Sequence, residues 1–361
     1  MARSRRVLVT GAARWWGADT ARRLGQDPNV AEVVAVDSVK VEPDLGRVSS
    51  LQLELRHGVV GRLIRSVGID TVIHTASVVD TDGGYNAAAH DSNLMGAINL
   101  LAACSGADSP VRRLVLKSST HVYGSRHDLP TYVREDRQVD DRSPHRAVRD
   151  MIEVERLFFD FAQRQAGIEV VVLRFANTLH VTDPGPLARH LDLALVPLPI
   201  GYEPMIQLIQ ADDCVDALAA ASRRGRGIYN IAAPRPLPLY ELLKIGGKQG
   251  FPILPPAGPT LALTVLAGVG IKTLTPQLYD LLRWGRTVST GQARRGMGFG
   301  AQRDTAGALE SYLSQRRAQR LAPKSDLADS ERQLRAFFQA RAQAAGEDRE
   351  SIGRGGISTE G

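Results

Sequence analysis

The chain has little cysteine, few aromatic side chains and no long apolar run. Its 361 residues include only two cysteines, and aromatic residues make up 5% of them. Cys104 and Cys214 lie far apart and form no C-x-x-C pair, which argues against a disulfide framework or a zinc site. We therefore expect no metal centre, and a reducing, cytoplasmic environment.

Apolar stretches are too short for a transmembrane segment, because a spanning helix needs about 20 consecutive apolar residues. The longest strongly apolar run covers residues 261–271 and favours a buried helix, with peripheral contact at a membrane surface as the alternative. The N-terminal MARSRR leads directly into the first apolar strand, so no signal sequence is expected there.

Positive charge is in excess but is not concentrated. The net charge is +6, and no basic stripe with interleaved aromatic residues is present, so nucleic acid is not an expected partner. Hydrophobic residues make up 43% and charged residues 23% of the chain, as is usual for a globular protein.

Short apolar strands alternate with amphipathic helices through the first half of the chain. The expected strands cover residues 6–11, 32–37, 51–55, 70–77, 112–120 and 169–177, and the expected helices cover 17–26, 59–68, 92–104 and 149–167. Val, Ile and Leu fill the strands almost continuously, which is typical of a parallel sheet buried on both faces. This pattern predicts an α/β fold with a Rossmann-type, doubly wound parallel sheet.

Composition divides the chain into three parts. Residues 1–180 are expected to form the Rossmann domain. Residues 181–314 are expected to form a smaller C-terminal substrate domain, with some segments packing back on the first. Residues 315–361 form a polar tail with one helix near 330–344 and then a disordered end.

The turn TGAARWWG, residues 10–17, stands where a nucleotide-binding loop belongs. A strand, a glycine-containing turn and a helix allow backbone N–H groups at the helix start to face a pyrophosphate. Asp37 ends the second strand about 20 residues later, where its carboxylate can accept hydrogen bonds from ribose hydroxyls.

Together these features resemble the extended short-chain dehydrogenase/reductase family, which includes the NAD-dependent nucleotide-sugar epimerases and dehydratases. The resemblance covers about residues 6–314 and implies NAD(P) binding. In the family the loop reads T-G-x-x-G-x-x-G; Gly11 and Gly17 match, but Arg14 replaces the middle glycine. Arg14 can compensate through a charge-assisted bond to phosphate. NAD is expected rather than NADP, because the carboxylate of Asp37 would repel a 2′-phosphate.

Two indoles follow Arg14 in this loop. Trp16 falls where the family packs an apolar side chain inward, so a core role is expected for it. Trp15 has three alternatives: core packing, a lid, or a plug in the phosphate groove. Both are included among the expected cofactor-side residues.

Other cofactor contacts follow from the resemblance. Glu54 and Leu55 fall at the position that contacts adenine. Thr75, Ala76 and Ser77 belong to a turn, HTAS, that lines the cofactor, and Asn93 matches a helix asparagine. For each position, ordinary maintenance of the fold is an equal alternative.

The family's chemistry requires a Ser or Thr hydroxyl, a Tyr, and a Lys four residues after the Tyr. The segment LKSSTHVYG matches the first motif and assigns the hydroxyl to Ser119. In the second motif, SPHRAVR, the Tyr position is His145 and the Lys position is Arg149. Two alternatives follow. Either the protein has lost oxidoreductase activity, or neutral His145 accepts the proton while Arg149 holds the cofactor ribose.

The end of the strand LRFAN brings Asn177 to the region of the substrate diphosphate, with bonding to loop backbone as the alternative. Asp212, farther along, is predicted to be a helix N-cap. We expect a non-catalytic or regulatory protein that binds NAD and a nucleotide-sugar-like small molecule. The alternative is an active epimerase, dehydratase or reductase that uses Ser119 with His145 and Arg149. A homodimer is expected by analogy with the family.

Overall fold

The computed structural model describes residues 4–41, 45–55, 58–77, 86–106, 108–165, 167–253 and 273–321. The apolar run at 261–271 and the tail helix near 330–344 lie outside the described residues, as does the chain end that was expected to be disordered. Among the described residues, no helix combines the length and the apolar character needed to cross a bilayer.

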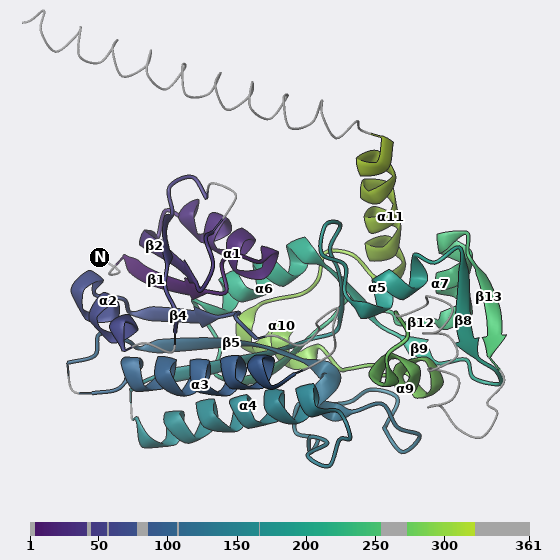
Figure 1. The fold of residues 1–361 in the computed structure, drawn as a ribbon, viewed down its shortest axis with the longest axis horizontal. Coiled ribbons are helices and arrows are strands. Elements are labelled where there is room, and N and C mark those ends of the chain that lie inside the picture. The colour runs from purple at the N-terminus through teal and green to yellow at the C-terminus, as the bar shows by residue number, and fades with distance from the viewer. Residues whose placement is uncertain are drawn as a thin grey trace, which may run out of the picture. The chain divides into compact units, whose positions relative to one another are not determined.

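Seven parallel strands form the main sheet (Figure 1), in the order β11-β6-β5-β4-β1-β2-β3. They are β1 (Arg5–Thr10), β2 (Val30–Asp37), β3 (Ser49–Gln52), β4 (Thr71–His74), β5 (Arg113–Ser119), β6 (Glu169–Phe175) and β11 (Gly227–Ile231). The chain runs outward from β1 in one direction and then returns to build the other half from β4. This order confirms the predicted Rossmann-type sheet, and its crevice lies at the carboxyl ends of β1 and β4.

Helices cover both faces of the sheet (Figure 1). The helices α2 (Val59–Val67), α3 (Ala87–Cys104) and α4 (Arg146–Arg164) lie on one face, and α1 (Trp15–Gly25) and α6 (Ala211–Ala221) lie on the other. Along β1, Val7 and Val9 point into the core shared with α1, whereas Leu8 points into the core shared with α2 and α3. Because both faces are buried there, the centre of β1 is apolar on both sides.

Smaller elements complete the fold, and all of them except η1 follow β6 in the chain. The short strands form three pairs: β7 (Asn177–Leu179) with β10 (Leu208–Gln210), β9 (Met205–Ile206) with β12 (Leu237–Pro238), and β8 (Leu195–Pro199) with β13 (Gln249–Ile253). The other helices of the described residues are η1 (Thr120–Tyr123), α5 (Pro186–Leu191), α7 (Leu239–Gly246), α9 (Pro276–Trp284), α10 (Gly291–Met297) and α11 (Thr305–Leu321). The compact unit that carries the sheet runs to Tyr312. The domain boundary at residue 180 stays a prediction.

Several element ends differ from the sequence-based expectation. Helix α3 begins at Ala87 and not at residue 92, because the side chain of Asn86 accepts a hydrogen bond from Ala89 N–H at 2.9 Å and caps the helix. The prediction that Asp212 caps a helix is wrong. Helix α6 begins at Ala211, and the Asp212 carboxylate in its first turn accepts a bond from the Gln210 amide at 3.0 Å.

Candidate active site

The loop between β1 and α1 keeps the two glycines that its backbone path requires. Gly11 has a φ of 79°, and a Cβ there would lie 2.7 Å from the backbone nitrogen of Ala76. A Cβ on Gly17 would lie 2.4 Å from the carbonyl oxygen of Gly11. Arg14 has a φ of −106°, which any L-residue adopts. The backbone itself therefore tolerates a side chain at the position of the family's middle glycine.

Two carboxylates hold this loop from either side. Asp37, at the end of β2, accepts a hydrogen bond from Ala13 N–H at 2.9 Å. Asp183, in the segment after β7, forms an ion pair with Arg14 at 3.2 Å. The Arg14 charge is thereby held at the rim of the cavity described below.

Trp15 and Trp16 stack on each other, with ring centroids 4.1 Å apart. Trp15 is buried and its other face stacks on His180 at 4.5 Å, so it both packs in the core and lines the adjoining cavity. Trp16 is half-buried, packs against Phe175 at 4.9 Å and also lines the cavity.

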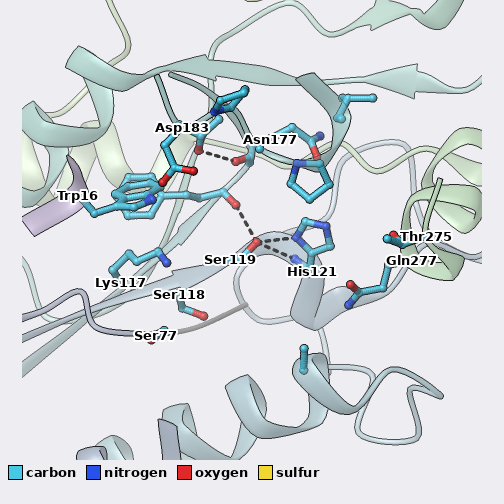
Figure 2. A pocket seen from close by; sticks show the side chains of 18 of the residues that line it. Trp16, Ser77, Lys117, Ser118, Ser119, His121, Asn177, Asp183, Thr275 and Gln277 are labelled. Carbon is cyan, nitrogen blue, oxygen red and sulfur yellow. Dashed lines mark hydrogen bonds between the residues drawn. The ribbon is translucent and has the colours of Figure 1, made fainter. Parts of the chain in front are cut away.

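A cavity of about 350 Å³ opens at the carboxyl ends of the central strands (Figure 2). Its wall runs from Trp15 and Trp16 past Ser119 to Asn177 and the start of α9. Of the other residues expected at the site, Thr75, Ser77 and His145 also line it. The amide of Asn177 donates to the backbone carbonyl of Gln207 at 3.0 Å, so it bonds the loop and faces the cavity at once.

The remaining expected cofactor residues lie outside the cavity wall: Gly11, Gly17, Asp37, Glu54, Leu55, Ala76 and Asn93. Asn93 is buried within α3, and Leu55 packs in the core shared by α2 and α3. Glu54 is half-buried beside Leu55, and Ala76 packs against Gly11.

Ser119 and His121 form a hydrogen-bonded pair inside the cavity (Figure 2). The distance from Ser119 Oγ to His121 Nδ1 is 2.7 Å, and the Ser119 hydroxyl also lies 3.3 Å from the Phe175 carbonyl oxygen. Burial lowers the pKa of His121 well below its usual value, and the charges of Arg286 and His145 lower it further. The imidazole of His121 is therefore neutral and keeps one nitrogen as a proton acceptor.

His145 and Arg149 are not brought together on Ser119. His145 is the N-cap residue of α4, and its Nε2 lies 3.2 Å from the Asp280 carboxylate. Arg149 is exposed, is not among the cavity-lining residues, and donates to the Ser143 carbonyl at 2.6 Å. The spacing of four residues survives, but the two side chains point to different partners.

Lys117 and His121 are the site residues that sequence reasoning missed. Lys117 is buried with its ammonium 5.0 Å from the centroid of the Trp16 ring, and it lines the cavity (Figure 2). A signal was available, because residues two apart on a strand share a face and Lys117 precedes Ser119 by two. Burial lowers the pKa of Lys117 to about 8, with the Arg14 charge adding to the effect and Asp183 opposing it.

The free energy of unfolding is expected to rise with pH through the range in which Lys117 titrates. The folded protein releases this proton near pH 8, while the unfolded chain keeps it to about 10.5, so stability is reduced below pH 8 and recovers above it. The full effect is about 3 kcal/mol. Urea unfolding of wild type and Lys117→Met across this range measures it; the exposed Lys244 provides the control variant, Lys244→Met. If Lys117→Met keeps the wild-type pH dependence, the burial argument is wrong.

Comparison with known sequences identifies the family. The sequence pattern of the NAD dependent epimerase/dehydratase family matches residues 7–232, more than half of the chain. The chain belongs to that family, as its sequence motifs indicated. An uncharacterized protein of Mycobacterium tuberculosis is 32% identical over 315 residues, covering 85% of this chain and 83% of the relative.

Solved structures share the fold at low sequence identity. A UDP-glucose 4-epimerase of Thermotoga maritima, solved with UDP-glucose, is 18% identical with a TM-score of 0.65, covering 88% of this chain and 100% of its own. A UDP-glucose 4-epimerase of Stenotrophomonas maltophilia, solved with NAD and a formylated UDP-arabinopyranose, is 21% identical with a TM-score of 0.67 and the same coverage. A dTDP-glucose 4,6-dehydratase of Streptomyces venezuelae is 21% identical with a TM-score of 0.66, covering 87% of this chain and 98% of its own.

Proposed function

We propose that this protein binds NAD and a nucleotide-sugar-like ligand in the cavity beside Ser119, without the family's Tyr/Lys proton relay. Its role is then non-catalytic or regulatory. The observation that carries the proposal is the position of Arg149, which is exposed and bonded to the Ser143 carbonyl. The residue at the family's Lys position therefore cannot assist a proton transfer at Ser119.

The residues present fit NAD. Gly11 and Gly17 keep the loop path that lets backbone N–H groups approach a diphosphate, and Asp37 supplies a carboxylate for ribose hydroxyls. Thr75 and Ser77 line the cavity at the end of β4, where a nicotinamide half would lie. NAD, when bound, supplies a hydride acceptor. The Stenotrophomonas epimerase and the Streptomyces dehydratase, which share this fold, were both solved with NAD, and this supports the assignment.

A thermal-shift series tests the proposed ligands. A ligand present at about 100 times its Kd stabilises by about 2.7 kcal/mol. In a chain of this length that raises Tm by roughly 2–4 °C. We expect this rise with NAD and a smaller one with NADP, because Asp37 repels a 2′-phosphate. The variant Asp37→Ala is expected to bind NAD more weakly. The difference between the Tm rise with NAD and the Tm rise with NADP should then become smaller. A Tm that neither NAD nor NADP changes would refute the proposal.

A second candidate function is an active oxidoreductase with a changed proton acceptor. The sequence-based form of this hypothesis uses Ser119 with His145 and Arg149. The 2.7 Å contact between Ser119 and His121 favours His121 in that role, because a neutral imidazole can accept a proton passed through the serine hydroxyl. Turnover lost in both Ser119→Ala and His121→Gln, and retained in Arg149→Ala, would support this candidate.

The homodimer is also part of the proposal. Helix α3 presents Met95 and Ile98 to solvent, 45% and 42% exposed, and it lies beside α4. Two apolar side chains one turn apart on an exposed helix face suit a helix-to-helix contact between two copies.

A further inference from the structure

A second cavity, of about 280 Å³, adjoins the one that holds Ser119. The two share His121, His145 and Gln277 in their walls. The second cavity continues between residues 124–127, residues 140–148 and the end of α9, and reaches Arg286. Only these shared side chains separate a ligand beside Ser119 from the second cavity.

Arg286 is a buried cation with an unused donor. Its side chain is only 6% exposed. Its Nε donates to the Thr120 hydroxyl at 3.1 Å, and its Nη1 donates to the Gly124 carbonyl at 3.2 Å and the Ser125 hydroxyl at 3.0 Å. Its Nη2 is buried and has no partner among the described residues. Burial lowers the pKa of Arg286 to about 9, still above neutral pH. A buried donor without an acceptor is costly, so a ligand acceptor there would be stabilising.

Gln277 supplies a second unused donor. Its Nε2 is buried and also has no partner among the residues that the structure describes. Gln277 lies in the first turn of α9 and lines both cavities. Figure 2 shows its side chain on the same side of the first cavity as His121.

The acidic side chains of the second cavity already have partners. Asp140 pairs with Arg126 at 2.8 Å, and Asp280 lies 3.2 Å from His145. None of the described carboxylates pairs with Arg286, so its single positive charge is left uncompensated. A monoanion matches this charge, whereas the two aspartates would oppose a dianionic phosphate.

We infer that the second cavity is a subsite for a carboxylate on the ligand, accepted by Arg286 Nη2 and Gln277 Nε2. A carboxylate offers two acceptor oxygens to these two donors, and a hydrogen bond to a charged group is among the stronger kinds. The substrate class is then a nucleotide sugar that carries a carboxylate, as a uronic acid does. This inference rests on the proposed function, because it requires the nucleotide sugar to occupy the first cavity.

Calorimetric titration of the full-length protein with UDP-glucuronic acid and UDP-glucose, both in the presence of NAD, tests the inference. We expect UDP-glucuronic acid to bind at least about tenfold more tightly. Arg286→Met should remove that preference and leave the Kd for UDP-glucose within about twofold. Gln277→Leu, which removes a neutral donor and should fold even if Arg286→Met does not, should reduce the preference several-fold. Arg134→Met, at a largely exposed arginine paired with Asp136, is the matched control and should change neither Kd.

The outcomes separate the two proposals. Equal affinity for the two sugars in wild type, or a preference that survives both Arg286→Met and Gln277→Leu, overturns the carboxylate subsite and leaves the proposed function standing. Binding of neither sugar overturns both.

Discussion

Glu155→Gln is expected to lower the free energy of unfolding by about 3–5 kcal/mol. Glu155 on α4 and Arg174 on β6 form an ion pair in which the side chains are 4% and 3% exposed. Arg174 also donates to the Tyr123 hydroxyl at 2.8 Å, and Glu155 accepts from the Ser118 hydroxyl. Removing the carboxylate charge leaves a buried guanidinium uncompensated on β6, directly beside the strand that carries Ser119. Urea unfolding at neutral pH measures the loss.

An exposed ion pair on the same helix provides the control for this measurement. Arg164 and Asp160 lie 4.0 Å apart with side chains 78% and 57% exposed. Asp160→Asn is expected to change stability by no more than about 0.5 kcal/mol. A Glu155→Gln protein as stable as Asp160→Asn would show that the buried pair does not hold α4 to the sheet.

Gly17→Ala is expected to weaken NAD binding about 100-fold and to lower stability by about 1–3 kcal/mol. The added Cβ would lie 2.4 Å from the Gly11 carbonyl oxygen and 2.8 Å from Ala12 Cα, both backbone atoms that cannot rotate away. The first turn of α1 must then move away from the loop, and the N–H groups that face a diphosphate move with it. Calorimetric titration with NAD and urea unfolding measure the two effects.

Gly96→Ala is the matched glycine control. Gly96 lies within α3, and a Cβ there meets no heavy atom within 4 Å. Alanine is expected to stabilise this helix by up to about 1 kcal/mol and to leave NAD binding unchanged. If Gly17→Ala binds NAD as the wild type does, the diphosphate does not depend on the close approach of loop and helix.

The fold was predictable because the central strands of the sheet are buried on both faces. Most side chains of residues 32–37 and 169–177 are apolar, and a parallel sheet covered on both faces buries them. Helix ends were less predictable. Helix α3 starts at Ala87 because the Asn86 side chain accepts a single hydrogen bond from Ala89 N–H. The spacing of hydrophobic residues gives no sign of such a cap.

The sequence predicted which site residues lie at the ends of strands. It did not predict which groups their neighbours' side chains contact. Ser119 and Asn177 follow from motifs at the ends of β5 and β6, where the parallel strands meet one edge of the sheet. Arg149 could not be placed from its spacing, because a spacing of four fixes a helix face but not the acceptor that a long side chain reaches. Arg286 lies 137 or more residues along the chain from Ser119, His145 and Arg149, so no local sequence pattern indicates it.

The central claim is that this cavity binds its ligands without transferring a hydride. One titration tests it directly, since two of the three tryptophans, Trp15 and Trp16, line the cavity and report occupancy by fluorescence. NAD and UDP-glucuronic acid are added to the wild-type protein at high concentration while the absorbance of reduced nicotinamide is followed in the same sample. The account predicts saturable quenching of tryptophan fluorescence with no reduced nicotinamide. Reduced nicotinamide formed in proportion to the protein, and absent in Ser119→Ala, would contradict it.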